Sequence, residues 1–228
     1  MSSTQQTHPG WFRTPIAAAM LCGVVASAFH ILDGHWIQPI LQFMSFETQY
    51  YLMVYVTFVI YLAGPAICRR SARLFLKAVV LAVPVVILHC GIYSLLDRFV
   101  VPNLRSLWSY ATLDKVLMIL ISMASTWAIA YFTSRMYGLR PCPRRVHVIA
   151  IVAGATASLL WYALYHLLLS SDDGSQPEIV PMAVMRSFLH DFIVTTLPAI
   201  AIERSLQIQA ANARAEVART SAATEAAQ

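Results

Sequence analysis

The chain has 228 residues, of which 58% are hydrophobic and 12% are charged, and its mean hydropathy is +0.63. Soluble domains carry about 25% charged and about 45–50% apolar residues. The apolar excess has to be solvated by lipid, which excludes a soluble enzyme or a DNA-binding domain in spite of a pI near 9.2. We therefore expect an all-α, polytopic membrane protein with no nucleic-acid partner.

Six segments have the composition of membrane spans. A spanning helix needs about 20 consecutive, mostly apolar residues. The segments that qualify are 15–32, 50–68, 74–96, 116–133, 146–169 and 180–202. The sequence thus predicts a six-helix transmembrane domain over 15–202, preceded by a short N-terminal segment, 1–14, and followed by a tail, 203–228.

The positive charges predict the orientation of these spans. Of the 16 lysines and arginines, 12 fall in the two terminal segments and in the loops after the second and fourth spans, and one, Arg186, lies within a span. Loops rich in lysine and arginine face the cytoplasm. We expect both termini to be cytoplasmic and the protein to lie in a bacterial inner membrane.

The tail has the composition of a helix. It is rich in alanine, glutamate, arginine and glutamine and nearly free of helix breakers. A coiled-coil seam with alternating four- and three-residue spacing runs through Leu206, Ala210, Ala213, Val217, Thr220, Thr224 and Ala227. This pattern favours a homodimer or another membrane complex, and the alternative is a solvated tail without a partner.

Polar side chains inside the predicted spans are the candidate functional residues, because burying them in lipid is costly. Several fall in the outer part of the membrane, where they can line a pocket for a small amphiphilic or anionic ligand. The candidate ligand-binding residues are His30, His89, Trp161, His166, Arg186, His190 and Asp191. The structural alternative is that the histidines form hydrogen bonds to tyrosine, serine or threonine on neighbouring helices.

Two other functions are compatible with the same residues. Imidazole binds haem iron and other transition metals, so His30, His89 and His166 are candidate ligands in a subunit of an electron-transfer or oxidase-type complex. Asp191 with His190 and Arg186 can instead form a proton or ion relay in a small transporter. The sequence contains no nucleophile, metalloprotease or phosphate-loop motif, and we therefore assign no catalytic residue.

The last third of the chain carries a resemblance to a known family. It combines the basic, apolar segment RRVHVIAIVAGATASLLWYALYHLLL, a polar loop, a last span and the helix QIQAANARAEVARTSAATEAAQ. This order resembles the membrane-sensor half of PHFLFN-type (LytS/YehU-like) bacterial sensor histidine kinases. In that family the linker helix leads into the phosphoacceptor helix.

The resemblance implies a sensor half without kinase activity, since the printed sequence contains no PHFLFN segment and no ATP-binding domain. Together, the span pattern, the polar residues and the resemblance give the leading prediction. The protein binds or senses a small ligand at its outer face and signals through the last span and the tail helix.

Overall fold

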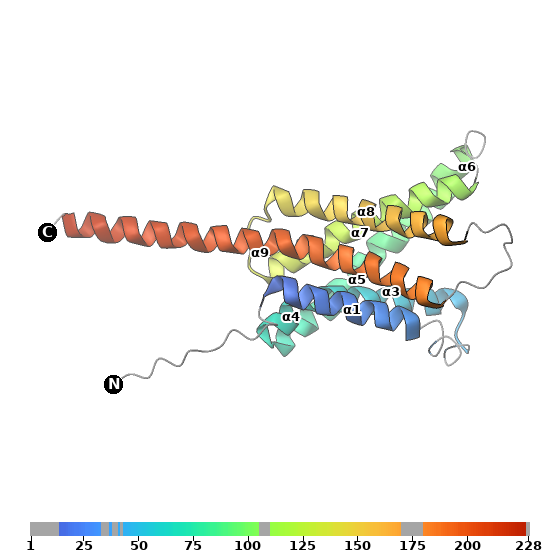
Figure 1. Cartoon of the computed structure of the whole chain (residues 1–228), viewed down its shortest axis with the longest axis horizontal. Helices are drawn as coiled ribbons and strands as arrows, with labels where there is room; N and C mark the ends of the chain where they lie inside the picture. Colours follow the sequence, from blue (N-terminus) through green and yellow to red (C-terminus); the bar gives the residue numbers. More distant parts are fainter. Residues whose placement is uncertain are drawn as a thin grey trace.

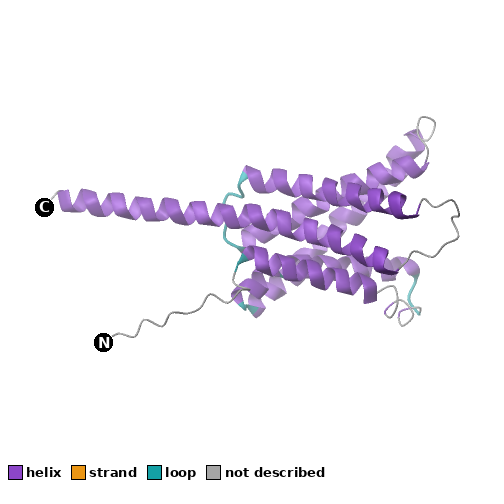
Figure 2. Ribbon diagram, viewed as in Figure 1, coloured by secondary structure: helices purple, strands orange, loops and turns teal. Residues whose placement is uncertain are grey.

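The computed structural model describes residues 14–32, 37, 41, 43–104, 110–169 and 180–226. Within this part of the chain every regular element is a helix (Figure 2). The helices are α1 (Pro15–Leu32), α3 (Phe46–Leu62), α4 (Gly64–Arg69), α5 (Ala72–Leu95), the π-helical turn η3 (Leu96–Val100), α6 (Val101–Leu104), α7 (Tyr110–Met136), α8 (Arg144–Leu169) and α9 (Val180–Ala226).

Four of these helices are long and apolar enough to cross a membrane, and the chain is therefore an α-helical membrane protein. They are α1, α5, the Thr112–Met136 part of α7 and the Arg144–Leu164 part of α8. The other two predicted spans are also helical. However, α3 has only 17 residues, and α9 carries Arg186 and Asp191 within its predicted span. Six crossings and two cytoplasmic ends remain predictions.

The predicted span 50–68 is not one helix, which corrects the sequence analysis. The chain breaks at Ala63, between α3 and α4. Pro65 occupies the first turn of α4, where its missing N–H group leaves no hydrogen bond unmade, whereas in a helix interior the same residue breaks the ladder.

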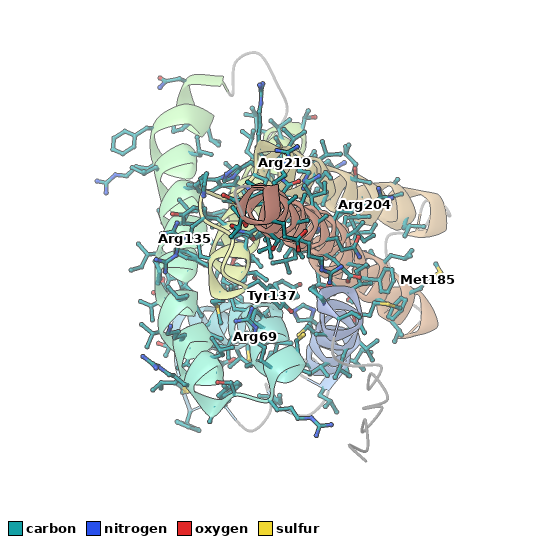
Figure 3. All side chains as sticks on the ribbon, turned by 90° about the vertical axis from the view of Figure 1, so that its left-hand side faces the viewer. Arg69, Arg135, Tyr137, Met185, Arg204 and Arg219 are labelled. Carbon is teal, nitrogen blue, oxygen red and sulfur yellow. The ribbon has the colours of Figure 1, made fainter. Side chains whose placement is uncertain are left out.

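The helices form a closed bundle in which chain neighbours are spatial neighbours. Along the chain, α1, α3, α5, α7, α8 and α9 each pack against the next, and α9 packs against α1. Figure 3 shows the bundle from the end at which the C-terminal part of α9 leaves it. We call this end the tail end.

Two glycines allow backbones to approach each other closely. A Cβ atom at Gly23 of α1 would lie 2.9 Å from Thr195 Oγ1 and 3.2 Å from Phe192 Cα, both on α9. A Cβ atom at Gly154 of α8 would lie 2.6 Å from the Ser122 carbonyl oxygen on α7. Small residues at helix contacts are typical of membrane bundles. The first contact places α1 directly beside the central part of α9.

Helix α9 has 47 residues and is about 70 Å long at a rise of about 1.5 Å per residue. Its C-terminal part projects from the bundle as a single helix (Figure 1), and all side chains of 207–225 are exposed. The helix expected from the composition of the tail is therefore present. Beyond Leu206, which packs partly against the bundle, its seam is open to solvent in the single chain, with Val217 65% exposed.

Two hydrogen bonds hold α9 to the bundle where the tail leaves. Arg145 Nε at the start of α8 donates to Ser205 Oγ over 2.8 Å. The Ile16 backbone N–H in the first turn of α1 donates to Glu203 Oε2 over 3.2 Å. A carboxylate at a helix N-terminus satisfies a free N–H group and interacts favourably with the helix dipole. The start of α1 and the last buried turn of α9 are thereby joined.

Candidate functional site: a buried histidine–aspartate cluster

Asp191 lies in the middle of the predicted last span, on α9, and its side chain is completely buried. A buried carboxylate is tolerated only where hydrogen bonds or opposite charges replace its hydration. Four side chains from three helices supply these contacts: Ser27 and His30 of α1, Tyr61 of α3 and His190 of α9.

The two carboxylate oxygens divide these partners between them. Oδ2 lies 3.1 Å from Ser27 Oγ and 3.1 Å from His30 Nδ1. Oδ1 accepts a hydrogen bond of 2.5 Å from the Tyr61 hydroxyl and lies 3.1 Å from His190 Nδ1. An ionised carboxylate only accepts hydrogen bonds, so all four groups donate to it. The carboxylate thus holds α1, α3 and α9 together at one level of the bundle.

The other ring nitrogens of the two histidines differ in their surroundings. His30 Nε2 lies 3.0 Å from Thr57 Oγ1 on α3. His190 Nε2 has no hydrogen-bond partner among the described residues, and the His190 and Trp161 rings pack edge-to-face with centroids 5.7 Å apart. The two side chains are 33% and 26% exposed, respectively. One imidazole is therefore fixed at both nitrogens, whereas the other keeps one nitrogen for a ligand.

Two adjoining cavities border this cluster. The first, which we call the first chamber, has a volume of about 330 Å³, and its lining includes Tyr50, Met53, Phe58, His89 and Ser125. The second chamber has a volume of about 420 Å³, and its lining includes Trp161, Tyr162, Ser187 and Asp191. Both chambers are lined by His30, Met118, Ser158 and His190. Cavities of about 300–1,000 Å³ are of the size that small-molecule sites use.

His89 provides a third imidazole in the wall of the first chamber. Its Nδ1 lies 3.0 Å from Ser125 Oγ on α7, and its Nε2 lies 3.4 Å from the Tyr50 hydroxyl on α3. The Phe58 ring packs edge-on against it, with centroids 5.4 Å apart. The hydrogen bonds of His30 to Thr57 and of His89 to Ser125 are the interhelical bonds that the structural alternative predicted.

Arg186 contacts Trp161, which lines the second chamber. Its guanidinium carbon is 4.2 Å from the centroid of the Trp161 ring, a distance at which cation and ring attract each other. Arg186 and His190 are one turn apart on α9, and both contact Trp161 of α8. This stack links α8 to α9 beside the cluster.

The structure places five of the seven predicted ligand-binding residues in the walls of the two chambers and a sixth in contact with one of them. The five are His30, His89, His190, Trp161 and Asp191, and Arg186 lines neither chamber but contacts Trp161. The seventh, His166, lies on α8, but its side chain is outside the described residues.

Hydroxyl groups were expected as partners of the histidines, but the individual residues that supply them were not identified from the sequence. Ser27, Thr57, Tyr61, Ser125 and Ser158 either bind the polar cluster or line the chambers. One signal for them was available in the sequence. Ser27 stands one turn before His30, and Thr57 one turn before Tyr61, so each pair shares a helix face.

The metal or haem alternative gains no support from the geometry. Among the described side chains, no group of three or more histidine, cysteine, aspartate or glutamate residues is placed to hold a metal ion. Of the three histidines predicted as ligands, His30 and His89 both line the first chamber.

No protein-family model, curated protein or solved structure matches the chain. The interpretation of the site therefore rests on its own geometry and on the sequence pattern.

Proposed function

We propose that this chain is a six-span inner-membrane protein of bacteria that binds a small ligand in the two chambers and signals through α9 to the cytoplasm. The charge distribution supports this topology, because lysines and arginines concentrate at one side of the predicted spans. The shape agrees with it, since α1 begins at the end of the bundle from which the tail projects (Figure 1). His30 near the end of α1 and His89 near the end of α5 then lie in the outer half of the membrane.

The observation that carries the proposal is the continuity of α9. A single helix contributes His190 and Asp191 to the chamber walls and then forms the exposed tail. Ser205, the last buried residue before the exposed part, lies about 21 Å along the helix from Asp191 at a rise of about 1.5 Å per residue. A rotation or shift of α9 at the chambers therefore moves the tail as well.

A ligand can change how α1 and α9 pack, because the contacts between these two helices adjoin the chambers. These helices are joined through Asp191 in the middle and through Glu203 at the tail end. A ligand at His30 and His190 competes for, or reinforces, the central contact. It shifts the arrangement only to the extent that it binds one arrangement more tightly than the other.

In this proposal, the partner of the tail is a second copy of the chain. The seam is exposed from Ala210 to Thr224, whereas its first residue, Leu206, is half-buried against the bundle. A coiled-coil contact would bury the exposed part. When two tails are held side by side, a movement of α9 changes the orientation of the two protomers relative to each other.

Hydrogen–deuterium exchange of the purified protein in lipid nanodiscs tests the proposal, with an organic extract of the host membranes as the source of ligand. We expect the extract to slow exchange in the segments that line the chambers and to change exchange in the tail. Both effects should disappear in Ser158→Phe, which fills the space shared by the chambers. They should persist in the matched control Ser94→Phe, whose side chain is exposed on α5.

Two results would contradict the proposal. Protection of the chambers without any change in the tail would show a binding site that does not signal. If neither region responds to the extract, or if Ser158→Phe responds as the unmodified chain does, the chambers are not the ligand site.

One observation favours a second candidate function, proton translocation. His30, Asp191 and His190 form a continuous hydrogen-bonded chain whose outer members line both chambers, and intramembrane Asp/His chains are typical of proton relays. In this case, liposomes that contain the protein should show proton flux that Asp191→Asn abolishes. The control His147→Gln, at a histidine that accepts a hydrogen bond from Trp127 and lines neither chamber, should retain the flux.

A further inference from the structure

The hydrogen-bonding character of the chambers follows from the buried carboxylate. Asp191 faces Nδ1 of both His30 and His190. Because the carboxylate accepts from both, both Nδ1 atoms carry a proton, and a neutral imidazole then has a lone pair on Nε2. A carboxylate that binds one ring nitrogen of a histidine fixes the tautomer in this way.

The Nε2 atoms of the two histidines differ in whether a side chain already engages them. His30 Nε2 lies 3.0 Å from Thr57 Oγ1, whose hydroxyl can donate to the lone pair of a neutral imidazole. His190 Nε2 has no such partner among the described residues. Of the two lone pairs, that of His190 is therefore the one left for a ligand.

This acceptor is accessible from the chambers. The His190 ring lines both of them and is 26% exposed. Some polar atoms in the described part of the chain are both buried and without a partner, but Nε2 of His190 is not one of them. Since Nε2 has no partner there, it is not a buried atom. A ligand atom in either chamber can therefore reach it.

The charges around the chambers disfavour an anionic ligand. No lysine or arginine is among the described residues that line either chamber, whereas Asp191 is part of the wall of the second. The nearby charge of Arg186 lies over the Trp161 ring. A carboxylate ligand would thus meet a lone pair and a like charge in a medium of low polarity, where unpaired charges are costly.

The remaining walls suit a flat apolar ring. Met53, Phe58 and Met118 line the first chamber, and Trp161 and Tyr162 line the second. Aromatic and thioether side chains make favourable contacts with aromatic rings. A cationic ligand would lose its hydration, and the Asp191 oxygens that could replace it already accept from four side chains, whereas a neutral ring loses no such hydration.

We propose, on the basis of the ligand-binding function proposed above, that the chambers take a neutral amphiphile whose aromatic hydroxyl donates a hydrogen bond to Nε2 of His190. Of the two ligand classes expected from the sequence, this inference keeps the amphiphile and replaces the anion. His190 is then the residue that selects the ligand, and Asp191 is a positioning residue that fixes the tautomer of His190.

Three probes with the same alkyl chain test this inference. 4-Hexylphenol carries the donor, 4-hexylanisole replaces the hydroxyl by its methyl ether, and 4-hexylbenzoate carries an anion. We expect titration calorimetry of the intact protein in nanodiscs to show the phenol binding about 10-fold more tightly than the ether, the effect of one hydrogen bond. The benzoate should bind more weakly than both.

Substitutions at His190 provide the matched controls. His190→Phe keeps a ring of similar shape but removes the acceptor, so the phenol should lose its advantage over the ether. His190→Gln places a carbonyl oxygen near the position of Nε2 and should retain part of it. His147→Phe, which changes a histidine outside the chambers, should bind all three probes as the unmodified chain does.

Each contrary outcome has a defined meaning. Tightest binding of the benzoate, lost in His190→Phe, would overturn this inference but leave the chambers as a ligand site. Equal affinity of the unmodified chain for the phenol and the ether would also overturn this inference. That result needs no variant, so the test holds even if His190→Phe fails to fold. Failure of all three probes to bind would also overturn it, whereas the exchange experiment with membrane extract decides the proposed function independently.

Discussion

Tyr55 and Tyr61 provide a matched test of whether Asp191 is ionised. Both tyrosines lie on α3, and each donates a hydrogen bond to another helix. The Tyr61 hydroxyl donates to Asp191 Oδ1 over 2.5 Å, whereas the Tyr55 hydroxyl donates to the Val79 carbonyl oxygen over 3.0 Å. Substitution by phenylalanine removes only the hydroxyl, so the two variants differ chiefly in the charge of the acceptor that is left behind.

The expected losses of stability differ because of that charge. A hydrogen bond between neutral groups in a membrane protein contributes about 0.6 kcal/mol on average. A hydrogen bond to a charged group contributes about 1.5–3 kcal/mol. We therefore expect Tyr55→Phe to lower the free energy of unfolding by about 0.6 kcal/mol and Tyr61→Phe by about 2 kcal/mol. Asp191 is fully buried, so its carboxylate is left with one donor fewer in Tyr61→Phe.

Unfolding by sodium dodecyl sulfate in mixed micelles, followed by circular dichroism, measures both values. A double-mutant cycle with Asp191→Asn isolates the interaction between Tyr61 and the carboxylate, and the same cycle with Tyr55 should give a coupling near zero. Equal losses in the two variants, or no coupling between Tyr61 and Asp191, would refute the assignment of an ionised carboxylate. The tautomer that we assign to His190 would then have no basis.

Three further predictions concern the contacts of α1 and α9. Gly23→Ala places a Cβ atom 2.9 Å from a side-chain oxygen of α9. Overpacking there should lower the stability by about 1–3 kcal/mol and thus lower the melting temperature. The control Gly91→Ala, with no atom within 4 Å of its Cβ position, should not lower the melting temperature. Glu203→Gln weakens the cap on the Ile16 N–H by about 0.3–1 kcal/mol, so hydrogen exchange should accelerate in the first turn of α1, and unchanged exchange there would contradict this. Removal of the tail after Ser205 should convert a dimer to a monomer in size-exclusion chromatography with light scattering, whereas an unchanged mass would show that the tail is not the dimer contact.

Properties that depend on local composition could be read from the sequence. The apolar runs identified all six helical segments of the bundle, and the bounds 15–32 agree with those of α1. The tail helix followed from its helix-forming residues, because the intrinsic preference of exposed side chains is not overridden by packing there. The break at Ala63 was missed because the run 50–68 was judged on its hydropathy, whereas Pro65 decides where the helix ends.

The candidate site could be predicted only in part, because position along a span gives depth but not direction. His30 and His89 were expected at similar depths, and both line the first chamber. However, His30 turns to Asp191, and His89 turns to Ser125. Which partner each histidine meets depends on the rotation of its helix about its own axis, and that rotation is set by packing against other helices.

The sequence alone thus determined the membrane environment, the helical segments and the polar residues within them, since these follow from the cost of placing each side chain in lipid. Only the tertiary structure decided that Ser27 and Tyr61, 164 and 130 residues from Asp191, supply two of its donors. The close approach of α1 to α9 at Gly23 and the closure of the bundle bring these groups together. The physical reason is that a buried charge selects its partners through three-dimensional proximity, which no spacing along the chain encodes.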